Sequence, residues 1–125
     1  MEKIETEKAP KAIGPYSQAV KVNNLVFTAG QIAISPATNQ MTGDDIVAQA
    51  TQIFENLKNL LKAAGTSLDN AIKVNVYLKD MNDFQKMNEI YGKYITNRPA
   101  RATIQAAALP KNALVEIDVI AELKE

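Results

Sequence analysis

The chain has 125 residues, 46% of them hydrophobic, which suits one domain with a substantial core, so we expect residues 1–125 to form a single domain. Fourteen Lys plus Arg balance fourteen Asp plus Glu, so no strong field favours a polynucleotide or an anionic membrane as partner. The absence of Cys and His excludes disulfides, Ser-His-Asp triads, zinc–His sites and the histidine pair of a ribonuclease, and leaves Glu, Asp, Lys, Arg, Tyr, Ser and backbone groups for any catalysis.

The first part of the chain predicts an extended arm followed by a hairpin. The Gly14-Pro15 pair predicts a turn within the arm. Two β-prone runs, 19–22 and 25–34, are joined by Asn23-Asn24, a pair that tolerates positive φ and suits a two-residue hairpin turn. Ser35-Pro36 ends the second run, so we expect the hairpin to stop there.

A long helix and a strand are predicted next. Asp44 or Asp45 can cap a helix through residue 64, because apolar residues recur there at helical spacing. Gly65 supplies the stop signal at the carboxyl end of this helix. Residues 72–79 alternate between apolar and polar side chains, which predicts a strand with Val74, Val76 and Leu78 on its buried face.

A second helix is predicted after this strand. Asn82 and Gln85 have the three-residue spacing of a capping box, and Arg98-Pro99 closes the helix because proline disfavours helix in the residue before it. An apolar stripe at helical spacing predicts the face that turns inward. Its members are Phe84, Met87, Tyr91, Tyr94 and Ile95.

The last two predicted strands cover residues 101–107 and 114–123, with a connecting loop at 109–112. The period of two in the final strand places Glu116 and Asp118 on the face opposite its apolar residues. The order of elements predicts the α+β class, with a small mixed sheet and two helices packed on one side. Leu114 and Ile120 are apolar residues expected on the uncovered face, so we expect a closed homo-oligomer.

Two charged residues are candidates for chemistry, each with an ordinary alternative. Arg101 begins a strand after Pro99-Ala100, where its planar guanidinium could form a bidentate pair with a carboxylate. A surface arginine in an ordinary ion pair is the more frequent case. Glu116 reads as a solvated side chain, but if oligomerisation covers its face, desolvation would raise its pKa and suit it to general-base work.

Other positions carry weaker signals. Gly30 interrupts a strand, which indicates a bulge or the close approach of another backbone or a ligand, and a bulge without a ligand is the more frequent case. Asn88 is a polar residue beside the helical stripe, and Tyr91 is typical of a core residue with its hydroxyl at the edge. No nucleotide or calcium motif occurs and the carboxylates are scattered, so we predict no metal.

Four short blocks, spread in order along nearly the whole chain, form a more specific pattern. They are AIGPYSQA at 12–19, TAGQI at 28–32, PAR at 99–101, and LPK through LVEI at 109–117. Together these blocks resemble the reactive intermediate deaminase (RidA) family. The resemblance implies a chorismate-mutase-like α+β fold and a homotrimer with clefts at the subunit interfaces.

The resemblance also implies a site at those interfaces. Arg101 matches the arginine that grips the substrate carboxylate, and Glu116 matches the acidic residue that positions the attacking water. Tyr16, Gly30 and Asn88 match pocket residues, and Arg101 and Tyr16 are expected to meet across subunits. A further position, Thr103, stands where many members carry a cysteine, so we expect a substrate contact there and catalysis that does not depend on a thiol.

The reaction that the resemblance implies is hydrolysis of 2-imino acids, tautomers of 2-aminoacrylate-type enamines, to 2-oxo acids and ammonia. It matches a 2-iminobutanoate/2-iminopropanoate deaminase that needs no cofactor, with Tyr16 or water as proton donor to the leaving amine. We expect a small 2-imino or 2-oxo carboxylic acid as ligand, no nucleic acid, no membrane and, because no targeting segment is recognisable, a cytoplasmic location. One alternative is a non-catalytic sensor or regulatory protein for small carboxylic acids, and a lesser one is an endoribonuclease or translation inhibitor.

Overall fold

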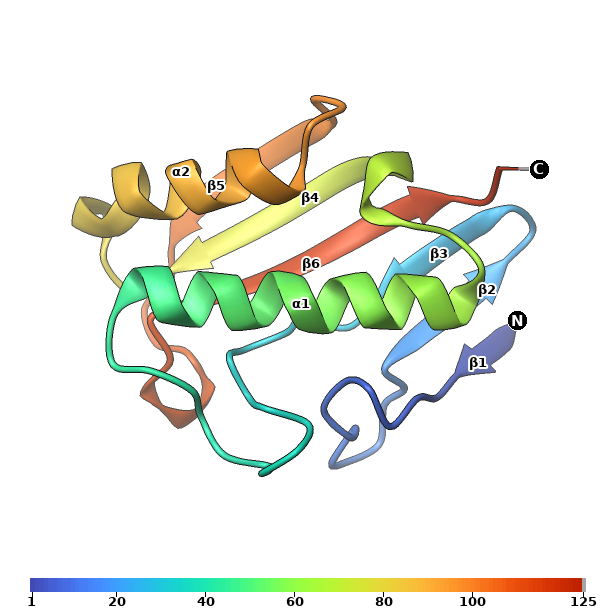
Figure 1. Cartoon of the computed structure of the whole chain (residues 1–125), viewed down its shortest axis with the longest axis horizontal. Helices are drawn as coiled ribbons and strands as arrows, with labels where there is room; N and C mark the ends of the chain where they lie inside the picture. Colours follow the sequence, from blue (N-terminus) through green and yellow to red (C-terminus); the bar gives the residue numbers. More distant parts are fainter. Residues whose placement is uncertain (125) are drawn as a thin grey trace.

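A six-stranded sheet carries two helices on one of its faces (Figure 1). The computed structural model describes residues 1–124, and the α+β fold predicted from the sequence is confirmed. Along the chain the elements are β1 (Glu2–Ile4), β2 (Ala19–Val22), β3 (Leu25–Thr28), α1 (Ile46–Ala64), β4 (Ala71–Leu78), α2 (Phe84–Tyr94), β5 (Ala100–Gln105) and β6 (Val115–Glu122).

The sheet is mixed, as predicted, with the strand order β1-β2-β3-β6-β4-β5. Its neighbouring strands are antiparallel except β4 and β5, which are parallel and are connected through α2. Parallel neighbours need a crossover connection, and the helix supplies it. The last strand in sequence, β6, therefore lies in the middle of the sheet, whereas β5 lies at an edge.

Helix α1 begins and ends where the sequence predicts. The side chain of Asp45 accepts a hydrogen bond from the backbone N of Ala48 at 2.8 Å, which satisfies one free N–H of the first turn. Gly65 adopts a φ of 91° at the carboxyl end, a left-handed conformation that favours glycine. The inner face of α1 buries Phe54, Leu57 and other apolar residues against the sheet.

The start of α2 differs from the prediction. Asn82 and Gln85 do not form a capping box, because a 3-10 turn at Met81–Asp83 precedes the helix. In that turn the side chain of Asp80 accepts from the backbone N of Asn82 at 2.9 Å, and this local bond competes with a helical start at Asn82. The helix ends at Tyr94, before the Arg98-Pro99 pair that was expected to close it.

The first hairpin strand covers the predicted residues 19–22, but the second is shorter than expected. Asn23 has a φ of 53°, as its place in the turn predicts, but β3 ends at Thr28 instead of continuing to residue 34. Beyond it, Gln31 forms an isolated bridge with Ile117, with N···O distances of 2.9 and 3.1 Å in the two directions. The chain leaves the ladder after Thr28 and returns at Gln31 for one residue pair with β6.

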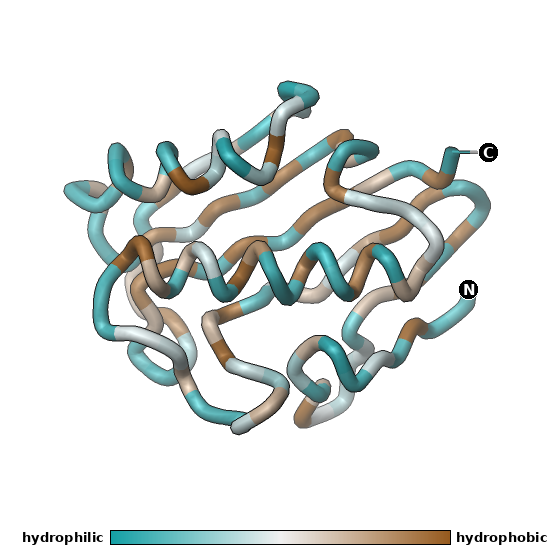
Figure 2. The backbone as a smooth tube through the Cα atoms, in the orientation of Figure 1, coloured by the Kyte–Doolittle hydropathy of each residue, from teal (hydrophilic) through white to brown (hydrophobic). Residues whose placement is uncertain are grey.

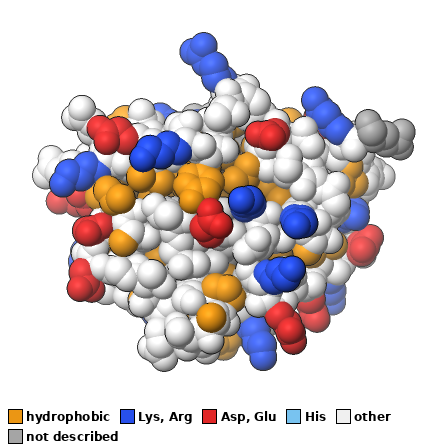
Figure 3. All heavy atoms as spheres, in the orientation of Figure 1, with side chains coloured by type: hydrophobic (Ala, Val, Ile, Leu, Met, Phe, Trp, Pro, Cys, Tyr) orange, Lys and Arg blue, Asp and Glu red, His pale blue; other side chains and the backbone are white. Residues whose placement is uncertain are grey.

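The two faces of the sheet differ in character. Hydropathy alternates along much of β4 and β6 (Figure 2), and the apolar residues on the inner face of β6, including Ile117, are buried under the helices. Charged side chains border an apolar strip on the helix-covered side of the molecule (Figure 3). The opposite face leaves Ile120 half-buried and, in β5, Ile104 53% exposed. Leu114 was expected on this open face, but it packs against the buried core beside the start of α1, where Gln49 accepts from its N–H at 2.9 Å.

Candidate active site

Glu116 lies on the open face of the sheet. In the ladder between β4 and β6 it is paired with Tyr77, and Asp118 is paired with Asn75. The strand alternation that buries Ile117 under α1 turns Glu116 and Asp118 away from the helices. Glu116 is half-buried, so its carboxylate is partly withdrawn from water while it stays accessible.

Gly30 makes room for the Glu116 side chain. A Cβ atom at this position would collide with Oε2 of Glu116, so only glycine fits while the carboxylate keeps its place. The bridge between Gln31 and Ile117 holds the Gly30 backbone against β6. The sequence indicated a bulge or the approach of a backbone or ligand, whereas the group that approaches Gly30 is the side-chain carboxylate of Glu116.

A cavity of about 480 Å³ opens beside these two residues. Tyr16, which is 55% exposed, lines it from the arm that precedes β2, and its hydroxyl accepts from the backbone N of Ile13 at 3.4 Å. Three of the predicted site residues, Tyr16, Gly30 and Glu116, thus share one cavity. Its other lining residues are Pro10, Lys11, Ile13, Gln18, Gln31, Ile32, Ile34, Pro110 and Lys111. A larger cavity of about 640 Å³ is lined by residues of the arm and not by Glu116, and it shares Lys11, Tyr16 and Gln18 with the first cavity.

The carboxyl groups on the open face influence one another. Burial raises the pKa of Glu116 above its ordinary value, and the negative charge of Asp118 raises it further. Burial also raises the pKa of Tyr77, with a further contribution from Asp118. The side-chain amide of Asn75 donates to Oδ1 of Asp118 at 2.8 Å, which fixes the position of that carboxylate. Glu116 therefore has the character of a carboxylate that accepts a proton more readily than an exposed one.

Arg101 lies on the other face of the sheet. It is paired with Val74, whose side chain is buried under the helices, so the guanidinium turns toward α2. Its Nη1 donates to Oδ1 of Asn88 at 2.6 Å, and its Cζ lies 4.6 Å from the ring centroid of Tyr91 and 5.4 Å from that of Phe84. Contacts of this kind fix a planar group in one orientation. Asn88 and Tyr91, which are ordinary helix residues by pattern, hold the arginine.

Thr103 follows Arg101 on the same face of β5 and is paired with Val76. Its Oγ1 is a buried side-chain atom that has no hydrogen-bond partner within residues 1–124. Buried hydroxyl groups normally have a partner, so this atom is a free donor and acceptor beside the arginine. The sequence alone gave no indication of this unsatisfied group.

The predicted site residues therefore form two groups. Tyr16, Gly30 and Glu116 meet at the open face, whereas Arg101 belongs with Asn88 and Thr103 at the β5 edge, on the helix-covered face. In the ladder, Tyr77 is paired with both Glu116 and Ile104, so β4 separates the two charged residues. Two strand spacings amount to about 10 Å, and the sheet itself lies between the side chains. A single chain does not bring Arg101 to Glu116.

Within residues 1–124, no group of three or more acidic side chains is placed to hold a metal ion. Over the same residues, no helix is long and apolar enough to cross a bilayer.

The protein is a small α+β protein with two helices on one face of a mixed sheet and a cavity beside a carboxylate on the other. We call its two groups of site residues half-sites: Tyr16, Gly30 and Glu116 form one, and Arg101, Asn88 and Thr103 form the other. The model of the Endoribonuclease L-PSP family matches residues 6–123. The chain is 54% identical to a RutC family protein of Pyrococcus horikoshii over 96% of each chain. It is 48% identical to a mouse protein named 2-iminobutanoate/2-iminopropanoate deaminase, over 94% of this chain and 88% of that one.

The fold of solved relatives is the same. The crystal structure of RidA from the Antarctic bacterium Psychrobacter sp. PAMC 21119 superposes with a TM-score of 0.94 at 45% identity, covering 98% of this chain and 100% of that one. The chain belongs to the reactive intermediate deaminase A family, the family of the L-PSP model. Members of this family include proteins named as imine deaminases.

Proposed function

We propose that the protein is an imine deaminase that hydrolyses 2-imino acids, tautomers of 2-aminoacrylate-type enamines, to 2-oxo acids and ammonia. The observation that carries this proposal is the half-buried carboxylate of Glu116, seated against Gly30 at the wall of a cavity. The second supporting feature is Arg101, whose guanidinium is oriented by Asn88 and two rings. Relatives named as imine deaminases support the same class of reaction.

The two half-sites require a second copy of the chain. We propose a homotrimer in which each interface brings Arg101 of one subunit to the Glu116 cavity of the next. Apolar side chains on the open face support this association, since Phe27 and Ile120 are only half-covered and Ile104 is exposed. In a cyclic trimer every subunit supplies one residue set to each neighbour, so three equivalent sites result.

The proposed substrate binds through its carboxylate. The parallel N–H donors of Arg101 match the two carboxylate oxygens, and this pair fixes the adjacent imine carbon near the cavity. Thr103 has a free hydroxyl at the same strand edge and is a second candidate donor to the substrate. Tyr16 and Gly30 line the same cavity, and Gly30 leaves the room that the Glu116 carboxylate occupies beside the substrate.

The reaction then needs one water molecule and one base. Water forms a bond to the imine carbon as a proton passes from it to Glu116, and the C=N electron pair moves to nitrogen. The C–N bond of the resulting carbinolamine breaks once its nitrogen is protonated, with Tyr16 or water as the donor. Ammonia leaves as the C=O bond forms and the hydroxyl proton is released. A protonated imine and water give a 2-oxo acid and ammonium, so the atoms and electrons balance without a cofactor.

The test is the release of ammonia and 2-oxo acid from imines that an amino-acid oxidase generates in situ. Wild type should accelerate release over buffer, and Arg101→Ala and Glu116→Gln should each remove the acceleration. Glu122→Gln is the matched control for Glu116, because it lies on the same strand but pairs with Lys124 at 3.5 Å near the surface. No acceleration by the wild type would refute the proposal.

The same experiment separates the alternatives. A sensor of small carboxylic acids would bind a 2-oxo acid through Arg101 but would show no turnover, with or without Glu116. If the protein were an endoribonuclease, RNA-degrading activity would stay proportional to the amount of this protein through every purification step. The equal numbers of acidic and basic residues and the absence of His in the chain argue against that activity, although the family model carries its name.

A further inference from the structure

The side chain of Gln18 makes four hydrogen bonds to one backbone segment. Its Oε1 accepts from the N of Thr6 at 2.8 Å. Its Nε2 donates to the carbonyl oxygens of Thr6, Ala9 and Pro10 at 3.0, 3.2 and 2.7 Å. Gln18 is only 4% exposed, so these bonds are shielded from water. One buried amide therefore fastens residues 6–10 to the start of β2.

This segment has few other attachments. Between residues 5 and 13 of the described chain, no backbone–backbone hydrogen bond outside the strand ladder is made. Two further side-chain bonds reach it in exposed positions: Asn59 Nδ2 donates to the carbonyl of Lys8 at 3.0 Å, and the hydroxyl of Tyr16 accepts from the N of Ile13 at 3.4 Å. Ala9 packs in the buried core, and Gln18 supplies the buried hydrogen bonds that hold the backbone around it.

The fastened segment leads directly into the cavity wall. Pro10, Lys11 and Ile13 line the Glu116 cavity, together with Gln18 itself. The backbone of Gln18 also reaches the opposite wall, because its carbonyl accepts from the N of Ala29, the neighbour of Gly30, at 2.8 Å. One residue thus connects the arm side of the cavity to the glycine side.

We infer that Gln18 is a positioning residue that holds the arm as the substrate-binding wall of the Glu116 cavity. The inference rests on the proposed function for its catalytic consequence, because the wall matters to turnover only if the cavity takes the substrate. It assigns no chemical step to Gln18, whose polar atoms are engaged by the backbone. Loss of the amide frees the arm, widens the cavity and weakens substrate binding, while Glu116 stays fixed by β6 and Gly30.

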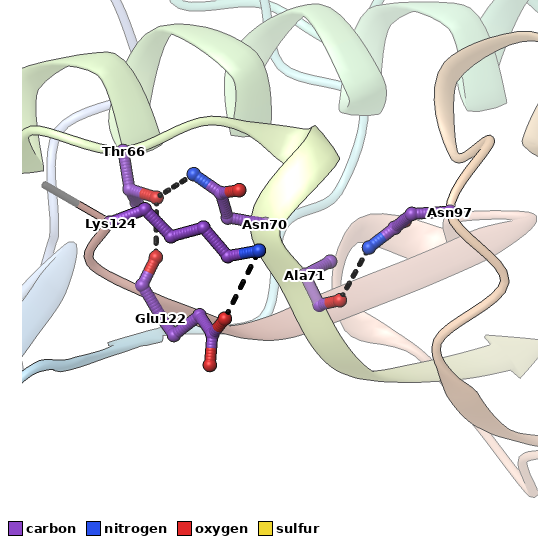
Figure 4. A network of polar contacts seen from close by, with 6 residues as sticks. All are labelled: Thr66, Asn70, Ala71, Asn97, Glu122 and Lys124. Carbon is purple, nitrogen blue, oxygen red and sulfur yellow. Dashed lines mark hydrogen bonds and ion pairs between the residues drawn. The ribbon is translucent and has the colours of Figure 1, made fainter.

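Two variants test this assignment. Gln18→Leu removes all four bonds, and Gln18→Glu keeps the acceptor for Thr6 but loses the donors to three carbonyls. The matched control is Asn97→Ala, which removes one amide-to-carbonyl bond of 2.9 Å to Ala71, shown in Figure 4. That bond joins the loop after α2 to the start of β4, and neither residue lines the cavity.

Amide hydrogen exchange, imine hydrolysis kinetics and the Kd of 2-oxobutanoate are measured on each variant. Both Gln18 variants should exchange faster at residues 5–13, with β4 and β6 unchanged. Their KM and Kd should rise on the order of tenfold to a hundredfold, the effect of a misplaced binding wall, with kcat within about twofold. The control should keep the wild-type arm exchange and KM. A variant that is only less stable would show a lower apparent kcat, because fewer of its molecules are folded, but its KM would stay the same.

The inference would be overturned if amide exchange at residues 5–13 stayed unchanged in the Gln18 variants. It would also be overturned if exchange there became faster while KM and Kd stayed at the values of the Asn97→Ala control. If neither variant folds, the wild type still decides: the Thr6 amide should be protected by Gln18, and exchange there at the rate of an open peptide would overturn the assignment. If the wild type hydrolyses no imine, the proposed function fails, but arm exchange and the Kd of 2-oxobutanoate still test the role of Gln18.

Discussion

Glu116 and Arg101 lie on opposite faces of one sheet, with β4 between their strands. Each has its own supporting residues: Gly30 makes space for the carboxylate, and Asn88 orients the guanidinium. The two groups are complete in themselves but separated by the thickness of the sheet. Chemistry that needs both must take place between chains, so association is a condition of the proposed activity.

Mixing inactive subunits should restore activity. In a trimer assembled from equal amounts of Arg101→Ala and Glu116→Ala chains, each site draws its arginine and its carboxylate independently from two subunits. About a quarter of the sites should then hold both wild-type residues, so about a quarter of wild-type activity should return. The variants are unfolded and refolded together, with each refolded alone as the control. A site contained in one chain would give no recovery.

Replacing Gly30 by Ala should impair activity far more than stability. The new Cβ would displace the Glu116 carboxylate, and a shift of about 1 Å in a catalytic group can cost about a hundredfold in rate. The matched control is Gly92→Ala in α2, where an added Cβ meets nothing within 4 Å. That variant should gain up to about 1 kcal/mol in helix stability and keep its kcat/KM. Equal kinetics for the two variants would contradict the role of Gly30.

The pH dependence of hydrolysis should respond to Asp118. Glu116 acts as a base only when ionised, so the rate falls as pH drops through its pKa, which burial and then Asp118 raise. Asp118→Asn removes the second cause and lowers the pKa, so the acid limb of the kcat/KM profile should move to lower pH. A profile that stays in place, measured over a range where the substrate imine is stable, would show that another group governs it.

The same shift has a consequence for folding. A carboxyl with a raised folded-state pKa opposes folding above its unfolded-state pKa, and this penalty vanishes as pH falls below that value. Glu116→Gln should therefore raise the Tm at neutral pH and lose that advantage in acid. Glu122→Gln, on the same strand near the surface, should show a smaller difference. Thermal unfolding at several pH values checks both variants.

Asn88 should control how well Arg101 binds the substrate carboxylate. Asn88→Ala leaves the guanidinium on the Tyr91 and Phe84 rings but removes the 2.6 Å hydrogen bond, so KM should rise by about tenfold. Asn88→Asp should be worse, because the new carboxylate would pair with Arg101 in place of the substrate. The inhibition constant of a 2-oxo acid should follow the same order. An Asn88→Asp protein with wild-type KM would argue against Arg101 as the carboxylate ligand.

Thr103→Val should separate stability from binding. The variant replaces a buried hydroxyl without a hydrogen-bond partner by a methyl group, so the Tm should stay the same or rise. If Thr103 donates to the substrate, affinity for a 2-oxo acid should fall by several-fold at the same time. Unchanged affinity would place Thr103 outside the substrate contacts.

Local signals in the chain predicted much of the fold. Asp45 and Gly65 bound α1 because capping depends on a few neighbouring backbone groups. The alternation in β6 separated Glu116 from the buried residues because a strand has a period of two. Local rules failed where a nearer partner competed, as Asp80 does at the start of α2, and where the chain left the ladder after Thr28.

The sequence by itself determined the class of fold, the position of Glu116 on the face opposite the apolar residues of its strand and the motifs that mark Arg101, since these depend on periodicity and on short blocks of residues. Only the tertiary structure decided that Gly30 lies against Glu116 and that Gln18 holds the arm, because these contacts join segments that the chain separates. It also decided that Arg101 and Glu116 face opposite ways. That relationship follows from strand order and pairing register, which are fixed by the packing of the whole sheet and not by any local pattern.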